Sequence, residues 1–323
     1  DGEIFVDLNS GQVTNEDSGR KGTCVPVGNG WFRVSIRGYI DLNTTAALYV
    51  YAWDNLSSGN YYLWGAQLET GCEATPYIKT TSTTNSTPRF EHSSTGESLG
   101  LLVEEERTNL ITYSEEFNVY QQSNVTVSAN ATATTSPDGN NTADLITEDS
   151  SAASLHRLNL KNLTVSAVAN TFSVFAKRAN GSRNLSINCN DLTGARAVFD
   201  LQNGVVGEII SGSASIQDVG NGWFRCSVTG TSSGTTSSAF LQLATGTTEN
   251  SSKTYDGDGT SGIYLWGVQL EAGSFPTSYI PTCGSTATRA ADIASITGTN
   301  FSGFYNQSEG TVFASGTTEN WNA

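Results

Sequence analysis

Three aromatic residues, Tyr51, Trp53 and Tyr255, are the first candidates for ligand chemistry in this sequence. Sugar rings stack on exposed aromatic faces, and amide and carboxylate groups around the ring bind the hydroxyls. None of the three recurs in the internal repeat described below, so a shared role in folding does not account for them. We interpret them as candidate glycan-binding residues. Packing between chains is the alternative, and the sequence does not decide between the two.

Two carboxylates, Asp256 and Asp258, alternate with glycines in the segment Asp256-Gly257-Asp258-Gly259. Carboxylate oxygens in a Gly-rich loop can chelate Ca²⁺, so both residues are candidate metal ligands, and Ca²⁺ is the one cofactor that the sequence suggests. The full twelve-residue calcium loop with its terminal Glu is absent. An ordinary solvated turn is therefore the favoured reading of this segment.

Catalytic chemistry finds little support among the titratable residues. Glu104, Glu105 and Glu106 are consecutive, and adjacent strand residues point to opposite faces, so their carboxylates are predicted to form a solvated surface and not a converging pair. The two histidines, His92 and His156, lie in no nucleophile or metal-binding pattern. We expect a protein that is not an enzyme.

An internal duplication sets the architecture, because three blocks recur in the same order. The paired blocks are Phe5–Leu8 with Val198–Leu201, Gly28–Arg33 with Gly220–Arg225, and Tyr62–Glu69 with Tyr264–Glu271. The second copy has about ninety residues before its first block, whereas the first copy has four. We expect the first copy to be the second half of a module, completed by chain preceding Asp1 or by another subunit. The sequence contains no Met, and we expect an internal piece of a longer polypeptide.

Four tryptophans recur with the repeat: Trp31, Trp64, Trp223 and Trp266. Residues kept in both copies are more often core than ligand platform, so all four are predicted to be buried. Their indole N–H groups should then bond to backbone acceptors.

Short alternating segments with Gly, Asn, Asp and Ser between them predict an all-β fold of tandem antiparallel jelly-roll or β-sandwich modules. Residues 1–80 form the C-terminal half of a first module, and 81–107 form a linker with a short strand at Leu99–Val103. Residues 108–282 form a complete module of ten predicted strands. Residues 283–323 are a linker and the start of a third β module, with strands at Ala291–Ile296 and Gly310–Ala314.

Charge and cysteine content exclude some partners. The 323 residues carry a net charge of −15, and the isoelectric point is near 4.4. This acidity argues against binding to nucleic acid and to anionic membranes, and no apolar run is long enough to span a bilayer. The five cysteines do not match between the copies, so we expect free thiols, with a Cys24–Cys72 disulfide as the alternative.

Several phrases together resemble the tail-fibre and minor structural proteins of tailed bacteriophages. They are the segments 100–110 and 113–117, the two Gly-Asn-Gly-Trp-Phe-Arg and the two Leu-Trp-Gly-x-Gln-Leu-Glu blocks, and the segments 278–282 and 288–292. The resemblance implies jelly-roll modules similar to carbohydrate-binding modules. It also implies a homotrimer that contacts other virion proteins and a host surface glycan, assembled in the host cytoplasm and then extracellular. Where that family often has Trp, this sequence has Tyr120.

The leading hypothesis is thus a non-catalytic, adhesive virion protein. Two alternatives remain open: a secreted or cell-surface carbohydrate-binding protein of a bacterium, and accessory modules of a depolymerase.

Overall fold

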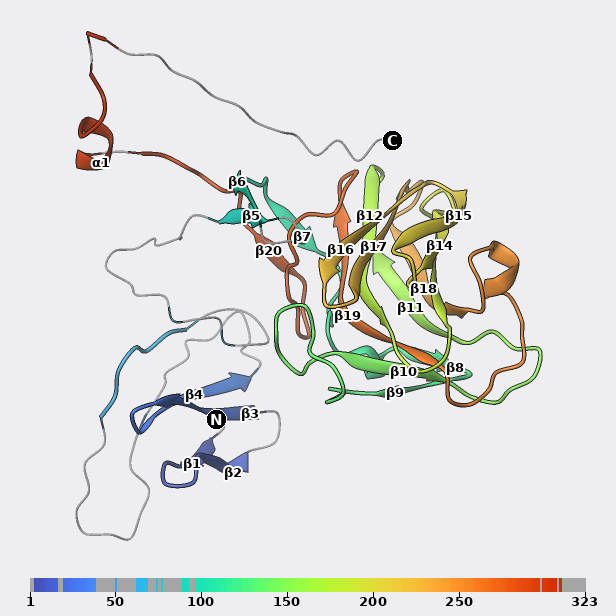
Figure 1. Cartoon of the computed structure of the whole chain (residues 1–323), viewed down its shortest axis with the longest axis horizontal. Coiled ribbons are helices and arrows are strands. Elements are labelled where there is room, and N and C mark those ends of the chain that lie inside the picture. Colours follow the sequence, from blue (N-terminus) through green and yellow to red (C-terminus); the bar gives the residue numbers. More distant parts are fainter. Residues whose placement is uncertain are drawn as a thin grey trace. The chain divides into compact units, whose positions relative to one another are not determined.

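A computed structural model describes residues 3–16, 20–38, 50, 62–68, 74, 77, 89–92, 97–296, 298–306, 308 and 309. The chain divides into two compact units, Asp1–Ser86 and Thr87–Ala323. The described elements are nearly all antiparallel strands, so the predicted all-β class is confirmed (Figure 1). In the described part of the chain, no helix has the length and apolar character needed to cross a membrane.

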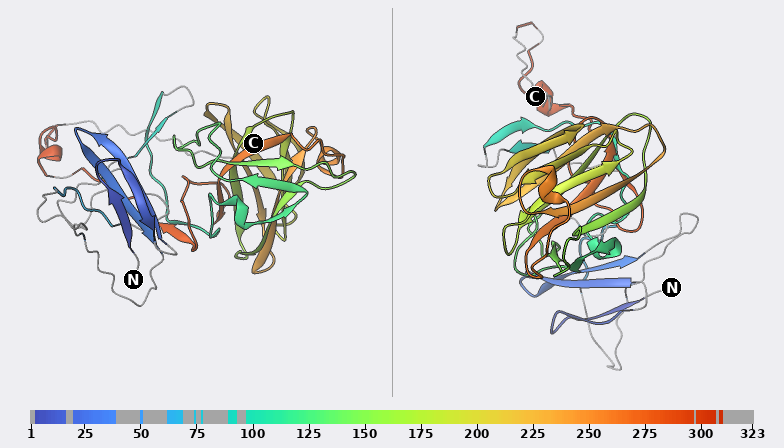
Figure 2. Two further views of the ribbon diagram at one scale, coloured as in Figure 1. Left: turned by 90° about the horizontal axis from the view of Figure 1, so that it is seen from below. Right: turned by 90° about the vertical axis from the view of Figure 1, so that its right-hand side faces the viewer.

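The second unit contains a β-sandwich of two six-stranded sheets, which lie as two layers in Figure 2. The first, called the β12 sheet, has the order β16 (Ser213–Gly220), β17 (Trp223–Thr231), β12 (Ala169–Arg178), β19 (Gly262–Ala272), β10 (Asp144–Glu148) and β9 (Val125–Ser128). The second, called the β13 sheet, has the order β15 (Val205–Ser211), β14 (Arg196–Asp200), β13 (Asn184–Asn190), β18 (Thr236–Ala244), β11 (Arg157–Thr164) and β8 (Gln121–Ser123). All ten strands predicted in this module are present.

The core lies between the sheets because alternate residues of each strand are apolar. On β13, for example, Leu185, Ile187 and Cys189 are at most 1% exposed and belong to the main core cluster. Leu241 and Leu243 of the neighbouring β18 pack into the same cluster. The intervening residues of these strands therefore face away from the core.

The Gly-Asn-Gly-Trp-Phe-Arg block builds a hairpin. Asn221 and Gly222 both have positive φ, as the two central residues of a tight hairpin turn require, and they connect β16 to β17. Trp223, at the start of β17, is 1% exposed, and its Nε1–H donates to the Thr135 carbonyl at 2.8 Å. Arg225 is buried and donates to the Thr277 carbonyl. The recurrence of this block is thus accounted for by its structural role, which is to form the turn and to place Trp223 and Arg225 in buried sites.

The Leu-Trp-Gly-x-Gln-Leu-Glu block builds a β-bulge. The register of β19 against β12 shifts beside Gly267, which has φ 62° and packs so closely on Phe175 that a Cβ atom would lie 3.0 Å from its ring. Gln269 and Glu271 accept the backbone N–H groups of Ile280 and Thr277. The block therefore fastens the end of the module to β19.

The two ends of the module are held together by a buried amide. The Asn109 side chain accepts the N–H groups of Ile111 and Leu270 and donates to the carbonyls of Val268 and Ile280. Every hydrogen-bonding site of this fully buried side chain is used, as burial requires. The short 3₁₀ turn η1 (Phe117–Val119) follows the entering segment.

The first unit repeats the local structure of the second. β1 (Ile4–Asp7) pairs with β2 (Gln12–Glu16), and β3 (Arg20–Gly28) pairs with β4 (Trp31–Gly38), as β14 pairs with β15 and β16 with β17. Close packing is repeated as well. A Cβ atom on Gly11 would lie 2.6 Å from Phe32, and one on Gly204 would lie 2.5 Å from Phe224. The described strands of the first copy thus match the second half of the module.

The sequence also predicts a strand at Tyr61–Leu68, and both this strand, as far as it is described, and the burial of Trp31 and Trp64 are wrong. Residues 62–68 are not a strand, and Trp31 and Trp64 are 43% and 74% exposed, whereas Trp266 is 4% exposed. The reason lies in the pairing of the second copy, where β10 and β12 flank β19, and β12 also flanks β17. Among the described residues of the first unit, no strand takes the place of β10 or β12.

The segments outside the sandwich contain short strand pairs. β5 (Phe90–His92) pairs with β6 (Ser98–Leu101), at the site of the predicted strand, and β7 (Arg107–Asn109) pairs with β20 (Ala287–Arg289). A one-turn helix, α1 (Thr299–Ser302), lies near the end of the described chain. The strand predicted at Ala291–Ile296 is not formed, and Gly310–Ala314 lies outside the described residues.

Glu104 departs from the predicted solvated surface. Its carboxylate accepts Arg89 at 2.8 Å, lies 3.1 Å from Arg289 and accepts the N–H of Ser278. Residues distant in sequence supply these partners, which the local pattern did not reveal.

Four cysteines are free thiols: Cys189 and Cys226 are buried, Cys24 and Cys283 are half-buried. Cys72 lies outside the described residues.

Candidate ligand-binding face

The outer face of the β13 sheet carries an array of polar side chains. Because the core takes Leu185 and Ile187 of β13, the alternate residues Asn184, Ser186 and Asn188 project outward. The same alternation applies to the flanking strands. The outward residues there are Ser238, Phe240, Gln242 and Ala244 of β18, Arg157 and Asn159 of β11, and Arg196, Val198 and Asp200 of β14.

Phe240 is the aromatic ring in the middle of this array. Its Cα partners on the two neighbouring strands are Asn159 and Asn188. The guanidinium of Arg157 lies over the ring, with its central carbon 4.3 Å from the ring centroid. Phe240, Asn188 and Arg157 are each partly exposed. An aromatic ring among amide and guanidinium groups has the chemistry that sugar recognition requires.

Four buried polar atoms on this face have no hydrogen-bond partner in the structure: Ser186 Oγ, Gln242 Nε2, and the Nε atoms of Arg157 and Arg196. A buried polar group without a partner costs about 1–3 kcal/mol. Gln242 and Ser186 are Cα partners across β18 and β13, and Gln242 is also the Cα partner of Arg157. The unpartnered atoms of these three residues therefore belong to one row across the sheet.

The loop after β18 lies over one end of this face. Tyr62 lies 15 positions after Ala47 in the first copy, whereas Tyr264 lies 25 positions after Ala239 in the second. The longer segment includes the 3₁₀ turn η2 (Glu249–Ser252). Arg196 donates to Glu249 at 2.9 Å, which attaches the loop to β14. The loop therefore borders the array of polar residues.

Tyr255 belongs to a structural network and not to the array around Phe240. Its hydroxyl donates to Glu148 at 2.7 Å, and Arg183 donates to the same carboxylate at 2.7 and 2.5 Å. The His156 ring centroid lies 4.6 Å from the ring of Tyr255, and the Arg183 guanidinium lies 5.2 Å from it. Burial raises the pKa of Tyr255. The ring and the hydroxyl therefore both contact protein groups.

Asp256 and Asp258 also use their oxygens within the loop. Asp256 accepts the N–H of Ala153, and Asp258 accepts the backbone and hydroxyl groups of Thr260 and Ser261. The hydrogen bonds from Ser261 and Thr260 lower the pKa of Asp258. In the described part of the chain, no group of three or more His, Cys, Asp or Glu side chains is placed to hold a metal ion. Calcium binding would have to displace these hydrogen bonds, and it stays a prediction.

Tyr51 and Trp53 lie outside the described residues, so their part in glycan binding also stays a prediction. The residues that sequence reasoning missed are Phe240 and Arg157. The signal available was the two-residue alternation of β11 and β18, in which an aromatic residue and an arginine take outward positions. Tyr51, Trp53 and Tyr255 were predicted instead, because they do not recur in the internal repeat.

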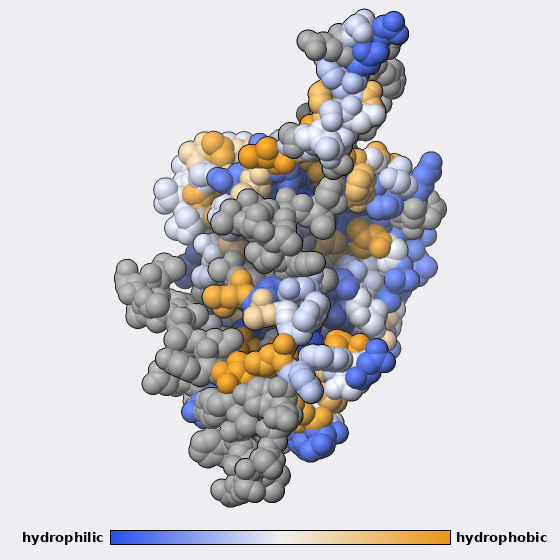
Figure 3. Space-filling model, turned by 90° about the vertical axis from the view of Figure 1, so that its left-hand side faces the viewer, coloured by the Kyte–Doolittle hydropathy of each residue, from blue (hydrophilic) through white to orange (hydrophobic). Residues whose placement is uncertain are grey.

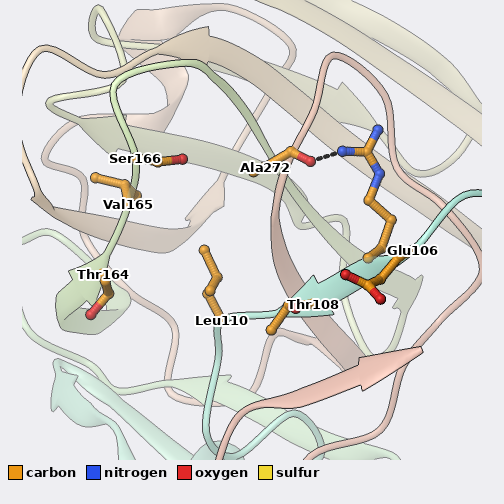
Figure 4. Close-up of a pocket in the computed structure, with 8 residues that line it drawn as sticks. Glu106, Thr108, Leu110, Thr164, Val165, Ser166 and Ala272 are labelled. Atoms are coloured by element: carbon orange, nitrogen blue, oxygen red, sulfur yellow. Dashed lines mark hydrogen bonds between the residues drawn. The ribbon is translucent and has the colours of Figure 1, made fainter. Parts of the chain in front are cut away.

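A separate hollow of about 310 Å³ lies beside β7 (Figure 4). Figure 4 shows Leu110, Val165 and Ser166 around the space, with Thr108 and Glu106 at its β7 side. None of its eight lining residues is aromatic. It therefore offers no ring for stacking, and the face around Phe240 is the better candidate for a glycan.

No family model matches the chain, and no curated protein matches it in sequence. Among solved structures, the xylan-binding CBM22-1 domain of Paenibacillus barcinonensis Xyn10C matches at 17% identity and a TM-score of 0.29, covering 50% of this chain and 92% of that one. The CBM22-1–GH10 modules of Clostridium thermocellum xylanase 10B, complexed with xylohexaose, match at 16% identity and a TM-score of 0.29. That match covers 55% of this chain and 30% of the other. At these scores, neither structure indicates a ligand for this protein.

Proposed function

We propose that this chain binds glycans weakly through the outer face of the β13 sheet, as an adhesive structural part of a tailed-phage virion. The observation that carries the proposal is the position of Phe240 among Arg157, Asn159 and Asn188, beside buried polar atoms that lack partners. The ring would supply stacking, and the partly exposed Asn188 amide and Arg157 guanidinium would bind glycan hydroxyls.

The chemistry of the face predicts weak binding at each site. One stacking ring contributes about 0.5–1.5 kcal/mol beyond the area that it buries. Clustering of identical sites raises the overall avidity by about two to four orders of magnitude. We therefore propose a homotrimer, as in the fibre proteins that the sequence resembles. Tyr51 and Trp53 remain candidates for a second glycan contact in the first unit.

The virion assignment rests on the sequence resemblance described above. Within it, the chain would contact other virion proteins and a host surface glycan, bind without hydrolysis, and be assembled in the host cytoplasm with reduced cysteines. The free, buried thiols Cys189 and Cys226 are compatible with folding in a reducing compartment.

The test is a glycan array probed with the intact chain at micromolar concentration, together with light scattering and an assay for released reducing ends. We expect retained glycans, a trimer mass and no increase in reducing ends. A chain that retains no glycan contradicts the binding proposal. A monomer contradicts the trimer, and new reducing ends contradict binding without cleavage. Mass spectrometry of purified phage particles tests the virion assignment directly.

A further inference from the structure

We infer that the outer face of the β13 sheet selects glycans that carry a carboxylate on the sugar ring, and that Arg157 binds this carboxylate. The inference rests on the proposed function and adds the chemical class of the ligand. Its basis is the difference between Arg157 and the other arginines of the sandwich.

Five arginines lie in residues 108–282, and four of them have hydrogen-bond acceptors. Arg183 pairs with Glu148, Arg196 with Glu249, Arg178 with the Gln202 side chain, and Arg225 with the Thr277 carbonyl and Ser173. For Arg157, the structure records a contact with the Phe240 ring and an Nε atom that is buried without a partner. Within the described part of the chain, it is thus a cation of the sandwich that no protein carboxylate neutralises.

The environment of Arg157 makes an anionic ligand favourable. The Arg157 side chain is partly buried, and this removal from water lowers the pKa of its guanidinium. Arginine nevertheless stays charged in proteins, so the charge requires compensation. A carboxylate can accept two parallel N–H groups from the planar guanidinium, and such charge-assisted pairs are stronger than hydrogen bonds between neutral groups. The stack on Phe240 holds that plane in place.

The neighbouring groups can bind the rest of a sugar. Arg157, Gln242 and Ser186 occupy successive strands in one row, and strands lie about 4.8 Å apart. The unpartnered Gln242 Nε2 donates only, and the Ser186 hydroxyl donates or accepts. Ser186 and Gln242 are only 1% and 3% exposed, so the accessible amide next to the ring is that of Asn188, the Cα partner of Phe240. The charge at Arg157 sets the class of glycan, and the Asn188 amide binds sugar hydroxyls without regard to charge.

The competing effect is the net charge of −15, which repels anionic glycans at long range. At physiological salt, charges more than about 8 Å apart are largely screened. Direct pairing at Arg157 acts within hydrogen-bond distance and is much less affected. We therefore expect local attraction to exceed the repulsion.

The experiment measures binding of the full chain to a matched pair of probes, tetragalacturonate and the same tetrasaccharide with its carboxyl groups reduced to hydroxymethyl groups. A wider array of neutral and uronic-acid glycans is probed in parallel. We expect the parent protein to prefer the carboxylated probe at least about tenfold, which corresponds to about 1.4 kcal/mol. Arg157→Gln should abolish the preference, because it lowers binding of the carboxylated probe far more than binding of the reduced probe.

Two further variants make the outcome specific. Arg157→Lys keeps the charge without the planar fork and should retain part of the preference. Arg178→Gln removes a cation from β12, in the other sheet, and should retain all of it. Thermal unfolding of each variant verifies that it is folded.

The possible failures are distinct. Equal binding of both probes, or a preference that Arg157→Gln leaves intact, overturns the inference while the glycan-binding proposal stands. Absence of binding to every glycan of either charge, by a folded parent protein, overturns the proposed function and the inference with it.

Discussion

Arg157 lies over the ring of Phe240, with 4.3 Å between the central guanidinium carbon and the ring centroid. The two side chains stand on neighbouring strands of the β13 sheet, and both point away from the core. A cation over an aromatic face contributes about 0.5–1 kcal/mol at an exposed site. The contact orders both side chains before a ligand arrives, so less entropy is lost on binding.

Phe240→Ala is expected to lower glycan affinity about tenfold, because it removes the stacking surface and the support of the Arg157 guanidinium. Isothermal titration with the best array ligand measures the effect. Phe275→Ala is the matched control, since Arg107 lies over Phe275 at 5.5 Å, away from the proposed face. An affinity that falls equally in both variants would argue against a specific role for Phe240.

The duplicated tryptophans give a paired test of stability. Trp223→Ala should destabilise its unit by about 3–5 kcal/mol, because it empties a buried site. Trp31→Ala should cost less than about 1 kcal/mol, because much of this side chain is already in water. Calorimetry of the full chain measures both changes. A large cost for Trp31→Ala would mean that other parts of the molecule cover this side chain in solution.

Figure 3 shows hydrophobic residues at the surface in the lower part of the view. In the first unit, Val25, Val27, Trp31 and Val34 are all more than two-fifths exposed. The prediction that the repeated tryptophans are buried is confirmed for Trp223 and Trp266 and wrong for Trp31 and Trp64, because burial depends on partner strands that local sequence does not reveal.

The folding of the complete module was accessible from sequence, because turn residues and alternation are local signals. Asn221-Gly222 marks a hairpin, and Leu185 and Ile187 mark an inward face. Two short or irregular strands were missed: β8 has three residues, and β15 contains Gly207 within its run. Such segments carry too little periodic pattern to be recognised.

The candidate site was harder to predict than the fold. Tyr255 lies in the longer loop, and its ring and hydroxyl contact His156, Arg183 and Glu148, a folding role that the sequence did not reveal. Phe240 stands in an apolar strand, so its sequence position alone does not mark it as outward-facing. Which face of a strand points outward depends on the register of the whole sheet, and that required the structure.

Tyr255→Phe is expected to destabilise the second unit by about 1–2 kcal/mol and to leave glycan affinity unchanged. It removes a hydrogen bond to the buried carboxylate of Glu148, which keeps its pairing with Arg183. Urea unfolding and titration with the array ligand measure the two properties. Loss of affinity in a variant of unchanged stability would instead place Tyr255 in the binding site.

Gly204→Ala tests the packing that both copies share. Gly204 has φ 66°, and a Cβ atom there would lie 2.5 Å from Phe224. We expect a loss of about 1–3 kcal/mol from backbone strain and steric conflict. Gly234→Ala is the control, since a Cβ atom there would meet only the Thr236 carbonyl oxygen at 4.0 Å. Equal stability of the two variants would contradict this account of the tight turn.

The acid stability of the second unit should depend on Asp258. Hydrogen bonds from Ser261 and Thr260 hold the pKa of this carboxyl below its ordinary value, so the folded protein favours the ionised form. The stabilisation is therefore present above the ordinary value of about 3.9, and it is lost as the pH falls through the lower pKa of the folded state. Asp258→Asn should be less stable than the parent at pH 6, and the difference should shrink as the pH falls below about 4. Urea unfolding from pH 6 to pH 2.5 measures this convergence.

The control is Asp256→Asn, which removes a carboxylate that accepts one backbone N–H, from Ala153, and should cost less stability at pH 6. Parallel stability curves for the parent and Asp258→Asn over the whole range would show that these hydrogen bonds do not favour the charged form.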